Sequence, residues 1–113
     1  MFAHEKFEAY QLSIKFLEIS LNLINKLPSG NAHMKDQLKR CATSISLNIA
    51  EGTGKKSKAD RNKFYFIARG SAMESAAVCD VIVLIEPLLR KEAEDGKEVL
   101  ESIVRILSKV CMK

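Results

Sequence analysis

The sequence has little of what interrupts helices: its 113 residues include two prolines, five glycines and no tryptophan. A many-stranded sheet would need more turns marked by Gly and Pro than this chain contains. With 47% apolar and 28% charged residues, the composition is that of a folded globular protein and not of a disordered chain. We therefore predict a single all-α domain spanning residues 1–113.

Histidine and cysteine are scarce, which restricts the chemistry. The two histidines, His4 and His33, have no cysteine or acid at a recognisable ligand spacing, so we expect no metal site. A nucleophile–base pair would have to recruit one of them, so we expect no catalytic residues and no cofactor. The cysteines, Cys41, Cys79 and Cys111, are odd in number and widely spaced, which favours buried thiols over disulfides.

No apolar run is long enough to cross a membrane. The longest, residues 76–89, is interrupted by Asp80 and Glu86, whereas a membrane helix needs about 20 predominantly apolar residues. The first ten residues, MFAHEKFEAY, lack the basic-then-apolar order of a secretory signal. We expect a cytoplasmic protein with no membrane partner.

Positive charge is concentrated in one segment. The chain has 18 Lys and Arg against 14 Asp and Glu, a net charge of +4. Residues 55–69 hold six of the basic residues and a single acid, Asp60, while the rest of the chain is slightly acidic. The basic residues of this segment are Lys55, Lys56, Lys58, Arg61, Lys63 and Arg69. They are our candidates for binding a nucleic acid.

Apolar residues recur at alternating spacings of three and four in four segments, the rhythm of helix-bundle seams. The predicted helices cover residues 5–27, 32–51, 58–86 and 90–111. Gly52 is the expected stop of the second helix. Ser57, with Asp60 three residues later, resembles a capping box for the third. Pro87 should end or kink that helix.

Each predicted helix has a seam, that is, a stripe of residues expected to face the neighbouring helices of the bundle. The first reads Phe7, Tyr10, Ile14, Leu17, Leu21 and Ile24; the second Met34, Leu38, Cys41, Ile45, Asn48 and Gly52; the third Phe64, Ile67, Ser71, Glu74, Val78, Val81 and Ile85; the fourth Ala93, Gly96, Leu100, Ile103, Leu107 and Val110. The first helix has a second apolar stripe, roughly 150° away, formed by Leu12, Phe16, Ile19, Leu23 and Leu27. One seam buries only one stripe, so the remainder needs further neighbours or another subunit. We predict homo-oligomerisation.

Polar residues interrupt the second and third seams. We predict that Asn48, Ser71 and Glu74 are hydrogen-bonded in the interior, because an unpaired buried polar group costs about 1–3 kcal/mol. Glu51 would lie near the end of the same seam. A sharper alternative makes Glu74 a functional carboxylate in a cavity. A single acid without a nearby histidine gives that alternative little support.

The segment GTGKKS between the second and third helices is not a nucleotide cradle. A Walker-type loop has glycine five residues before its Gly-Lys pair and a hydroxyl after it, but this chain has Ile49 and Lys56 there. Two interpretations stay open. The loop is a solvated turn, or Lys55, Lys56 and Lys58 form an anion site at the positive end of the third helix.

Three aromatic residues follow the loop. Phe64, Tyr65 and Phe66, beside basic residues, suggest a base-stacking platform. Phe64 and Phe66 each also belong to an apolar stripe, however, so core packing is the favoured interpretation.

Residues 40–75 resemble a known family. The shared pattern is S-I-x-x-N-I-A-E-G, followed by a basic loop and A-R-G-S-x-x-E. Its positions in this chain are Ser44, Ile45, Asn48, Ile49, Ala50, Glu51, Gly52, Lys55, Ser57, Ala68, Arg69, Gly70, Ser71 and Glu74. The family comprises the small helical proteins encoded in intervening sequences of bacterial 23S ribosomal RNA genes. The segment around Pro87 departs from the family's pattern.

The resemblance implies an antiparallel up-down four-helix bundle that assembles into a ring-like homopentamer. The family is similar to the accessory protein of diversity-generating retroelements, which engages nucleic acid and a reverse transcriptase through basic surfaces. No enzymatic activity is established for the family. We therefore predict a non-enzymatic oligomer that binds RNA or another nucleic acid through residues 55–69. The alternatives are a protein-interaction scaffold with merely solubilising lysines and, more remotely, an enzyme using Glu74.

Overall fold

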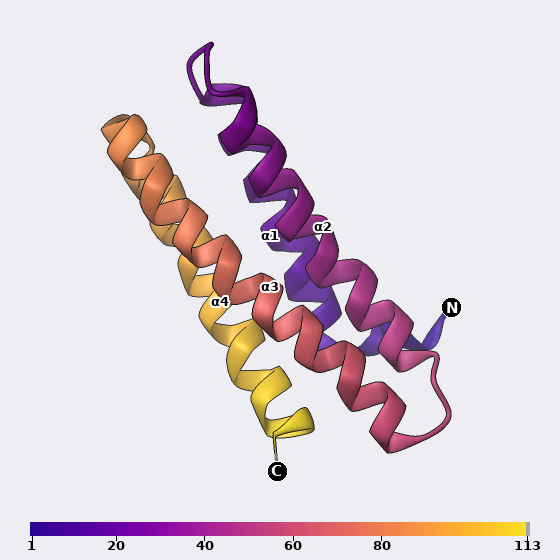
Figure 1. Ribbon diagram of the computed structural model, residues 1–113. Coiled ribbons are helices and arrows are strands. Elements are labelled where there is room, and N and C mark those ends of the chain that lie inside the picture. Colours follow the sequence, from indigo (N-terminus) through magenta and orange to yellow (C-terminus); the bar gives the residue numbers. More distant parts are fainter. Residues whose placement is uncertain (113) are drawn as a thin grey trace.

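The computed structural model describes residues 1–112, which form four long helices (Figure 1). These are α1 (Glu8–Lys26), α2 (Ala32–Thr53), α3 (Lys58–Ile85) and α4 (Arg90–Cys111). Two 3₁₀ turns, η1 (Ala3–Lys6) and η2 (Pro87–Leu89), precede α1 and α4. Residues 1–112 contain no strand, and the predicted all-α class is confirmed.

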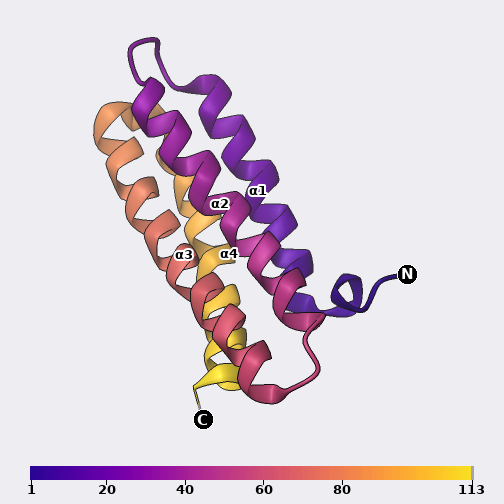
Figure 2. The same ribbon diagram turned by 45° about the vertical axis from the view of Figure 1, so that its right-hand side comes forward.

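Consecutive helices run in opposite directions and pack side by side, so the chain forms an up-and-down bundle (Figures 1 and 2). The bundle measures 44 × 23 × 22 Å. The α2–α3 loop lies at the same end of the bundle as η1 and the end of α4, whereas the α1–α2 loop and the α3–α4 junction lie at the other end (Figure 2). The charged segment is therefore at one end of an elongated molecule.

Local signals account for most helix ends. The Ser57 hydroxyl accepts a hydrogen bond from the Asp60 amide at 3.1 Å and caps α3, as predicted. α3 ends just before Pro87, also as predicted. The expected stop at Gly52 is wrong, because α2 continues to Thr53 and the Gly54 amide bonds back to its last carbonyls. The first helix begins later than predicted, because Phe7 has extended backbone (φ −83°, ψ 121°).

The seams predicted for α2 and α4 supply the core. Their buried members are Leu38, Cys41, Ile45 and Gly52 in α2, and Ala93, Gly96, Leu100, Ile103 and Leu107 in α4. In α1 the second stripe is the buried one, with Phe16 and Leu23 fully enclosed. Ile14 and Leu21 of the first stripe remain 42% and 44% exposed.

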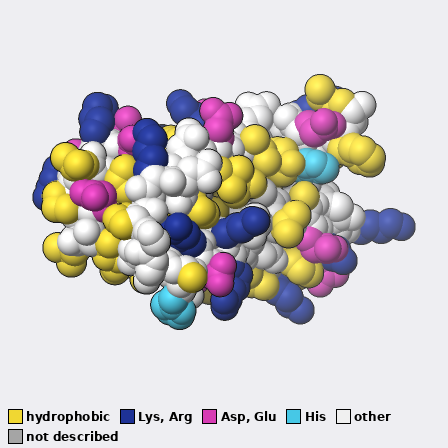
Figure 3. Space-filling model, turned by 90° about the horizontal axis from the view of Figure 1, so that it is seen from above, with side chains coloured by type: hydrophobic (Ala, Val, Ile, Leu, Met, Phe, Trp, Pro, Cys, Tyr) yellow, Lys and Arg dark blue, Asp and Glu magenta, His cyan; other side chains and the backbone are white. Residues whose placement is uncertain are grey.

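The seam predicted for α3 is wrong by about one residue. Its buried stripe consists of Tyr65, Ala68, Ala72, Ser75, Val78, Cys79 and Ile82. Of the predicted seam, Val78 is buried as predicted, whereas Ile67, Val81 and Ile85 are exposed. The small side chains let α3 approach its neighbours closely, and larger apolar residues face outward. Exposed apolar side chains lie between charged ones on the face drawn in Figure 3.

Serine hydroxyls provide the buried polar contacts. Ser46 of α2 donates to Ser13 of α1 at 2.9 Å, and the Ser75 hydroxyl of α3 lies 3.1 Å from the Cys41 sulfur of α2. Ser20 donates to a carbonyl of its own helix at 2.9 Å. Within residues 1–112, every buried side-chain nitrogen and oxygen has a partner. The buried polar groups are therefore satisfied by hydroxyl, thiol and carbonyl partners, without a buried charge among the described residues.

The cysteines are free thiols. Cys41 and Cys79 are buried, as predicted, whereas Cys111 is only partly buried. Burial raises the pKa of Cys79 to about 12, so its thiol stays protonated at neutral pH. Among the described residues, no helix has the length and apolar character needed to cross a membrane.

Candidate nucleic-acid interface

Arg61 fixes the path of the loop between α2 and α3. Its guanidinium donates hydrogen bonds to the backbone carbonyls of Lys55 at 3.2 Å and Lys56 at 2.6 Å. The loop is thereby tied to the first turns of α3. Arg61 is one of the six basic residues predicted to bind nucleic acid. Its charged group is instead hydrogen-bonded within the loop, to carbonyls past the end of α2.

Lys55 is also partly engaged. Its ammonium lies 3.1 Å from the Glu51 carboxylate, one turn earlier in α2, and 5.3 Å from the centroid of the Phe64 ring. The ion pair and the cation–π contact hold the side chain over the end of the bundle. Lys55 therefore offers less uncompensated charge than its neighbours.

Lys56, Lys58 and Lys63 are exposed and uncompensated. None of them belongs to an ion pair in the part of the chain that the structure describes. Lys58 is the first residue of α3, where the helix dipole disfavours a cation. Its charge therefore does not stabilise the helix. Lys56 and Lys58 place positive charge beside the amide groups that begin α3, and Lys63 adds to it more than one turn further along the helix.

Arg69 joins two helices. Its Nε donates a hydrogen bond at 2.7 Å to the Ser108 hydroxyl near the end of α4, and the residue is half-buried. Of the six predicted basic residues, Lys55, Arg61 and Arg69 thus have partners within the fold. The sequence pattern does not separate these three from the free lysines.

The predicted interior position of Glu74 is wrong, and Asn48 and Ser71 are only partly buried, whereas the predicted hydrogen bonding of all three is confirmed. Glu74 is exposed and hydrogen-bonds the Gln37 amide group of α2. The offset of the α3 seam turns Ser71 toward the outer edge of the α2–α3 contact, where it is half-buried. Asn48 of α2 lies at the same edge and is also half-buried. Since Glu74 lies on the surface, the structure gives no support to a carboxylate enclosed in a cavity.

The motif residues nevertheless form a polar row along that edge, hydrogen-bonded from Ser71 to Asn48. The Ser71 and Ser44 hydroxyls are 2.8 Å apart, and the Asn48 amide donates to the Ser44 carbonyl at 2.8 Å. Glu51, one turn further along α2, is exposed and pairs with Lys55. The row therefore leads from the middle of the bundle to the basic loop.

Gly52 permits the close approach of α2 and α3 near the loop. A Cβ atom there would lie 2.9 Å from the Tyr65 ring and 3.1 Å from the Arg61 carbonyl oxygen. Tyr65 is buried, its hydroxyl is 2.9 Å from that of Thr53, and its ring centroid is 5.5 Å from that of Phe7. The start of α3 is thereby anchored under the loop.

The three consecutive aromatic residues have different surroundings. Core packing is confirmed for Tyr65, and Phe64 is half-buried beneath Lys55. For Phe66 the core interpretation is wrong, because its side chain is 54% exposed. Its i+3 and i+4 spacing to other apolar residues does define a stripe, but that stripe faces away from the bundle.

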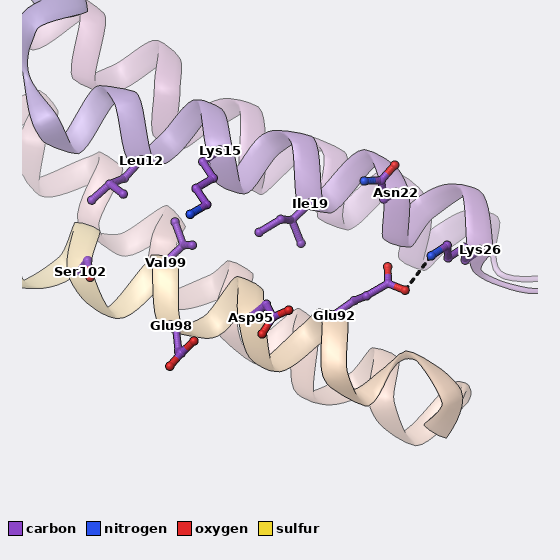
Figure 4. A pocket seen from close by; sticks show the side chains of 10 residues that line it. All are labelled: Leu12, Lys15, Ile19, Asn22, Lys26, Glu92, Asp95, Glu98, Val99 and Ser102. Atoms are coloured by element: carbon purple, nitrogen blue, oxygen red, sulfur yellow. Dashed lines mark hydrogen bonds and ion pairs between the residues drawn. The ribbon is translucent and has the colours of Figure 1, made fainter.

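A groove of about 670 Å³ between α1 and α4 was not predicted (Figure 4). Leu12, Ile19 and Val99 give it apolar lining, Lys15 and Lys26 extend from α1, and Glu92, Asp95 and Glu98 extend from α4. Lys26 and Glu92 form an ion pair at 2.7 Å across it. The groove depends on the register between the first and last helices, for which the sequence has no local signal.

The helices and their antiparallel order define the protein as an up-and-down four-helix bundle with a basic loop at one end. Its sequence matches the family of the 23S rRNA-intervening sequence protein over residues 5–109, and the chain belongs to that family. The family resemblance found in residues 40–75 is thereby confirmed.

A solved structure has the same fold. It is the crystal structure of a protein with unknown function from the S23 ribosomal protein family of Bacteroides thetaiotaomicron VPI-5482. The TM-score is 0.84 at 24% sequence identity, and the match covers 93% of this chain and 99% of that chain. No curated protein matches the sequence. The likeness shows the fold.

Proposed function

We propose that the protein is a non-enzymatic, cytoplasmic helical bundle that binds RNA or another nucleic acid through the α2–α3 loop and the start of α3. The observation that carries the proposal is the exposed, uncompensated charge of Lys56, Lys58 and Lys63. A polyanion would supply the missing negative charge. The description of the family, which refers to 23S rRNA intervening sequences, supports RNA as the nucleic acid.

Removing the three free lysines should change the salt dependence of RNA binding. With Lys56, Lys58 and Lys63 replaced by glutamine, the log–log slope of affinity against salt should flatten by roughly 2–3 units per engaged subunit, because each phosphate contact contributes about 0.7–0.9. Fluorescence anisotropy of a labelled single-stranded RNA across a KCl series measures this slope. Solvated lysines contribute little to stability, so the variant should stay folded.

A matched control removes the same charge elsewhere. Lys26, Lys91 and Lys97 each form an ion pair with an acid, and their replacement by glutamine also removes three positive charges. This variant should keep nearly the parent's slope. If both triple variants have the same slope, binding follows net charge only and the loop is a solvated turn.

We propose further that copies of the chain associate through the outward face of α3. Its residues Met73, Val81, Leu84 and Ile85, with the adjoining Leu88, are between 37% and 88% exposed. Together they expose apolar area on the order of several hundred Å², the size of patch that marks interaction sites. The number of copies, five in a ring, is an expectation from the family resemblance alone.

Association is tested by replacing Leu84 with glutamate. The parent should have a molar mass several-fold above 12.6 kDa in light scattering, and the L84E variant a lower one, because a charge at the interface would have to be desolvated. Leu47 of α2, also exposed, provides the control L47E, which should keep the parent's mass. A parent of 12.6 kDa at all micromolar concentrations would reject association.

A second candidate function is a protein-interaction scaffold, such as an accessory protein of a reverse transcriptase. The groove between α1 and α4 favours it, because side chains of opposite charge flank an apolar lining. The two functions differ in what accompanies the purified protein. Without nuclease treatment, strong ultraviolet absorbance in the nucleic-acid band supports RNA binding, and its absence supports the scaffold.

A further inference from the structure

Phe66 differs from the other aromatic residues of the long helices. Tyr10, Phe16, Phe64 and Tyr65 are buried or half-buried, whereas Phe66 is 54% exposed on the outer side of α3. Burying such a side chain would stabilise the fold by about 1.5–3 kcal/mol. Because more than half of the Phe66 side chain is exposed, the fold gains only part of this stabilisation from it.

The surroundings of Phe66 are positive and open. Residues three and four apart are neighbours on a helix surface, so Lys63 lies one turn before the ring, and Arg69 and Gly70 one turn after it. A Cβ atom at Gly70 would meet nothing within 4 Å, so no side chain crowds that side of Phe66. An aromatic ring is thus accessible beside an uncompensated lysine and an arginine.

We propose that Phe66 stacks on an unpaired base of a single-stranded nucleic acid whose phosphates contact Lys63 and the lysines of the loop. This inference rests on the proposed function and makes it more specific. Lysines alone contact the backbone of single strands and duplexes alike. An exposed aromatic ring beside them adds a stacking surface that only an unpaired base can use.

Charge also separates Phe66 from the proposed contact between copies. Met73 and Leu84 lie on the same side of α3 as Phe66, but further along the helix and away from the loop. A second copy packed on Phe66 would have to approach Lys63 and Arg69, which is unfavourable for another basic end. A polyanion is complementary to the same surface.

Two substitutions isolate the aromatic ring. Phe66→Leu keeps an apolar side chain but removes the π-face, and Phe66→Tyr keeps the ring. Phe66→Leu should weaken binding of a labelled single-stranded RNA by about 5- to 150-fold, the range found for loss of one stacked base. Phe66→Tyr should bind nearly as tightly as the parent. Both variants should match the parent in their affinity for the corresponding duplex and in the salt slope of binding.

A probe with 2-aminopurine adds a direct readout, because stacking quenches its fluorescence. Quenching by the parent and the tyrosine variant, and its loss with Phe66→Leu, would support the proposal. If the parent binds RNA and Phe66→Leu binds it equally well, stacking is refuted while lysine-mediated binding stands. A parent that binds no RNA refutes both. If Phe66→Leu lowers the molar mass in light scattering and leaves affinity unchanged, the ring belongs to a contact between copies and the stacking proposal is wrong.

Discussion

Replacing Phe16 with alanine is expected to lower the free energy of unfolding by about 3–5 kcal/mol, a large part of the roughly 5–15 kcal/mol that stabilises a domain. Phe16 is fully buried in α1. Its ring faces Gly96 of α4, where a Cβ atom would lie only 3.1 Å from the ring. Without the ring, this contact becomes a cavity beside the groove between α1 and α4.

Urea unfolding followed by circular dichroism measures the loss, at one protein concentration because association would add to stability. Phe66→Ala is the matched control, since it removes the same atoms from an exposed position. It should change the free energy of unfolding by no more than about 0.5 kcal/mol. Similar losses in both variants would contradict the burial that distinguishes the two phenylalanines.

Replacing Gly52 with alanine is expected to destabilise the bundle by about 1–3 kcal/mol, the cost of overpacking. The new methyl group would lie 2.9 Å from the buried Tyr65 ring and 3.1 Å from the Arg61 carbonyl oxygen. A backbone carbonyl cannot move aside as a flexible side chain can, so α2 and α3 would have to separate. The midpoint of thermal unfolding should fall accordingly.

Gly70→Ala should act in the opposite direction. Gly70 also lies within a helix, but a methyl group there would contact nothing within 4 Å. Alanine has the higher helix propensity, so the free energy of unfolding should rise by up to about 1 kcal/mol. A stabilised Gly52→Ala variant would contradict the close packing of α2 and α3 near the loop.

The helices were predictable, but the side that each helix buries was predictable only in part. In α2 and α4 one side of the helix carries an apolar stripe and the opposite side is largely polar. The spacing of the apolar residues therefore identifies the side that is buried in the core. α3 has small residues such as Ala68 and Ala72 on its buried side and large apolar residues such as Leu84 outside. Periodicity ranks large apolar residues first and therefore selects the wrong stripe. Close packing of neighbouring helices decides the orientation, and no local pattern encodes it.

The candidate site, too, was predictable from the sequence only in part. The excess of positive charge in residues 55–69 is a property of composition and was visible in the sequence. Which cations remain free depends on the path of the loop and the register of α3 against α4. Arg61 reaches back to the loop carbonyls, and Arg69 reaches Ser108, 39 positions along the chain. Neither partner follows from spacing along a single helix.

The hydrogen bonds from Arg61 to the carbonyls of Lys55 and Lys56 have a consequence for the energetics of recognition. They hold main-chain atoms, so the path of the loop at Lys55 and Lys56 does not depend on the lysine side chains that it displays. Such a loop is preorganised: binding a phosphate backbone would not be opposed by the entropy of ordering its four residues, 54–57, about 1–2 kcal/mol for each. Its lysines can therefore be exchanged for other residues while the loop keeps its conformation.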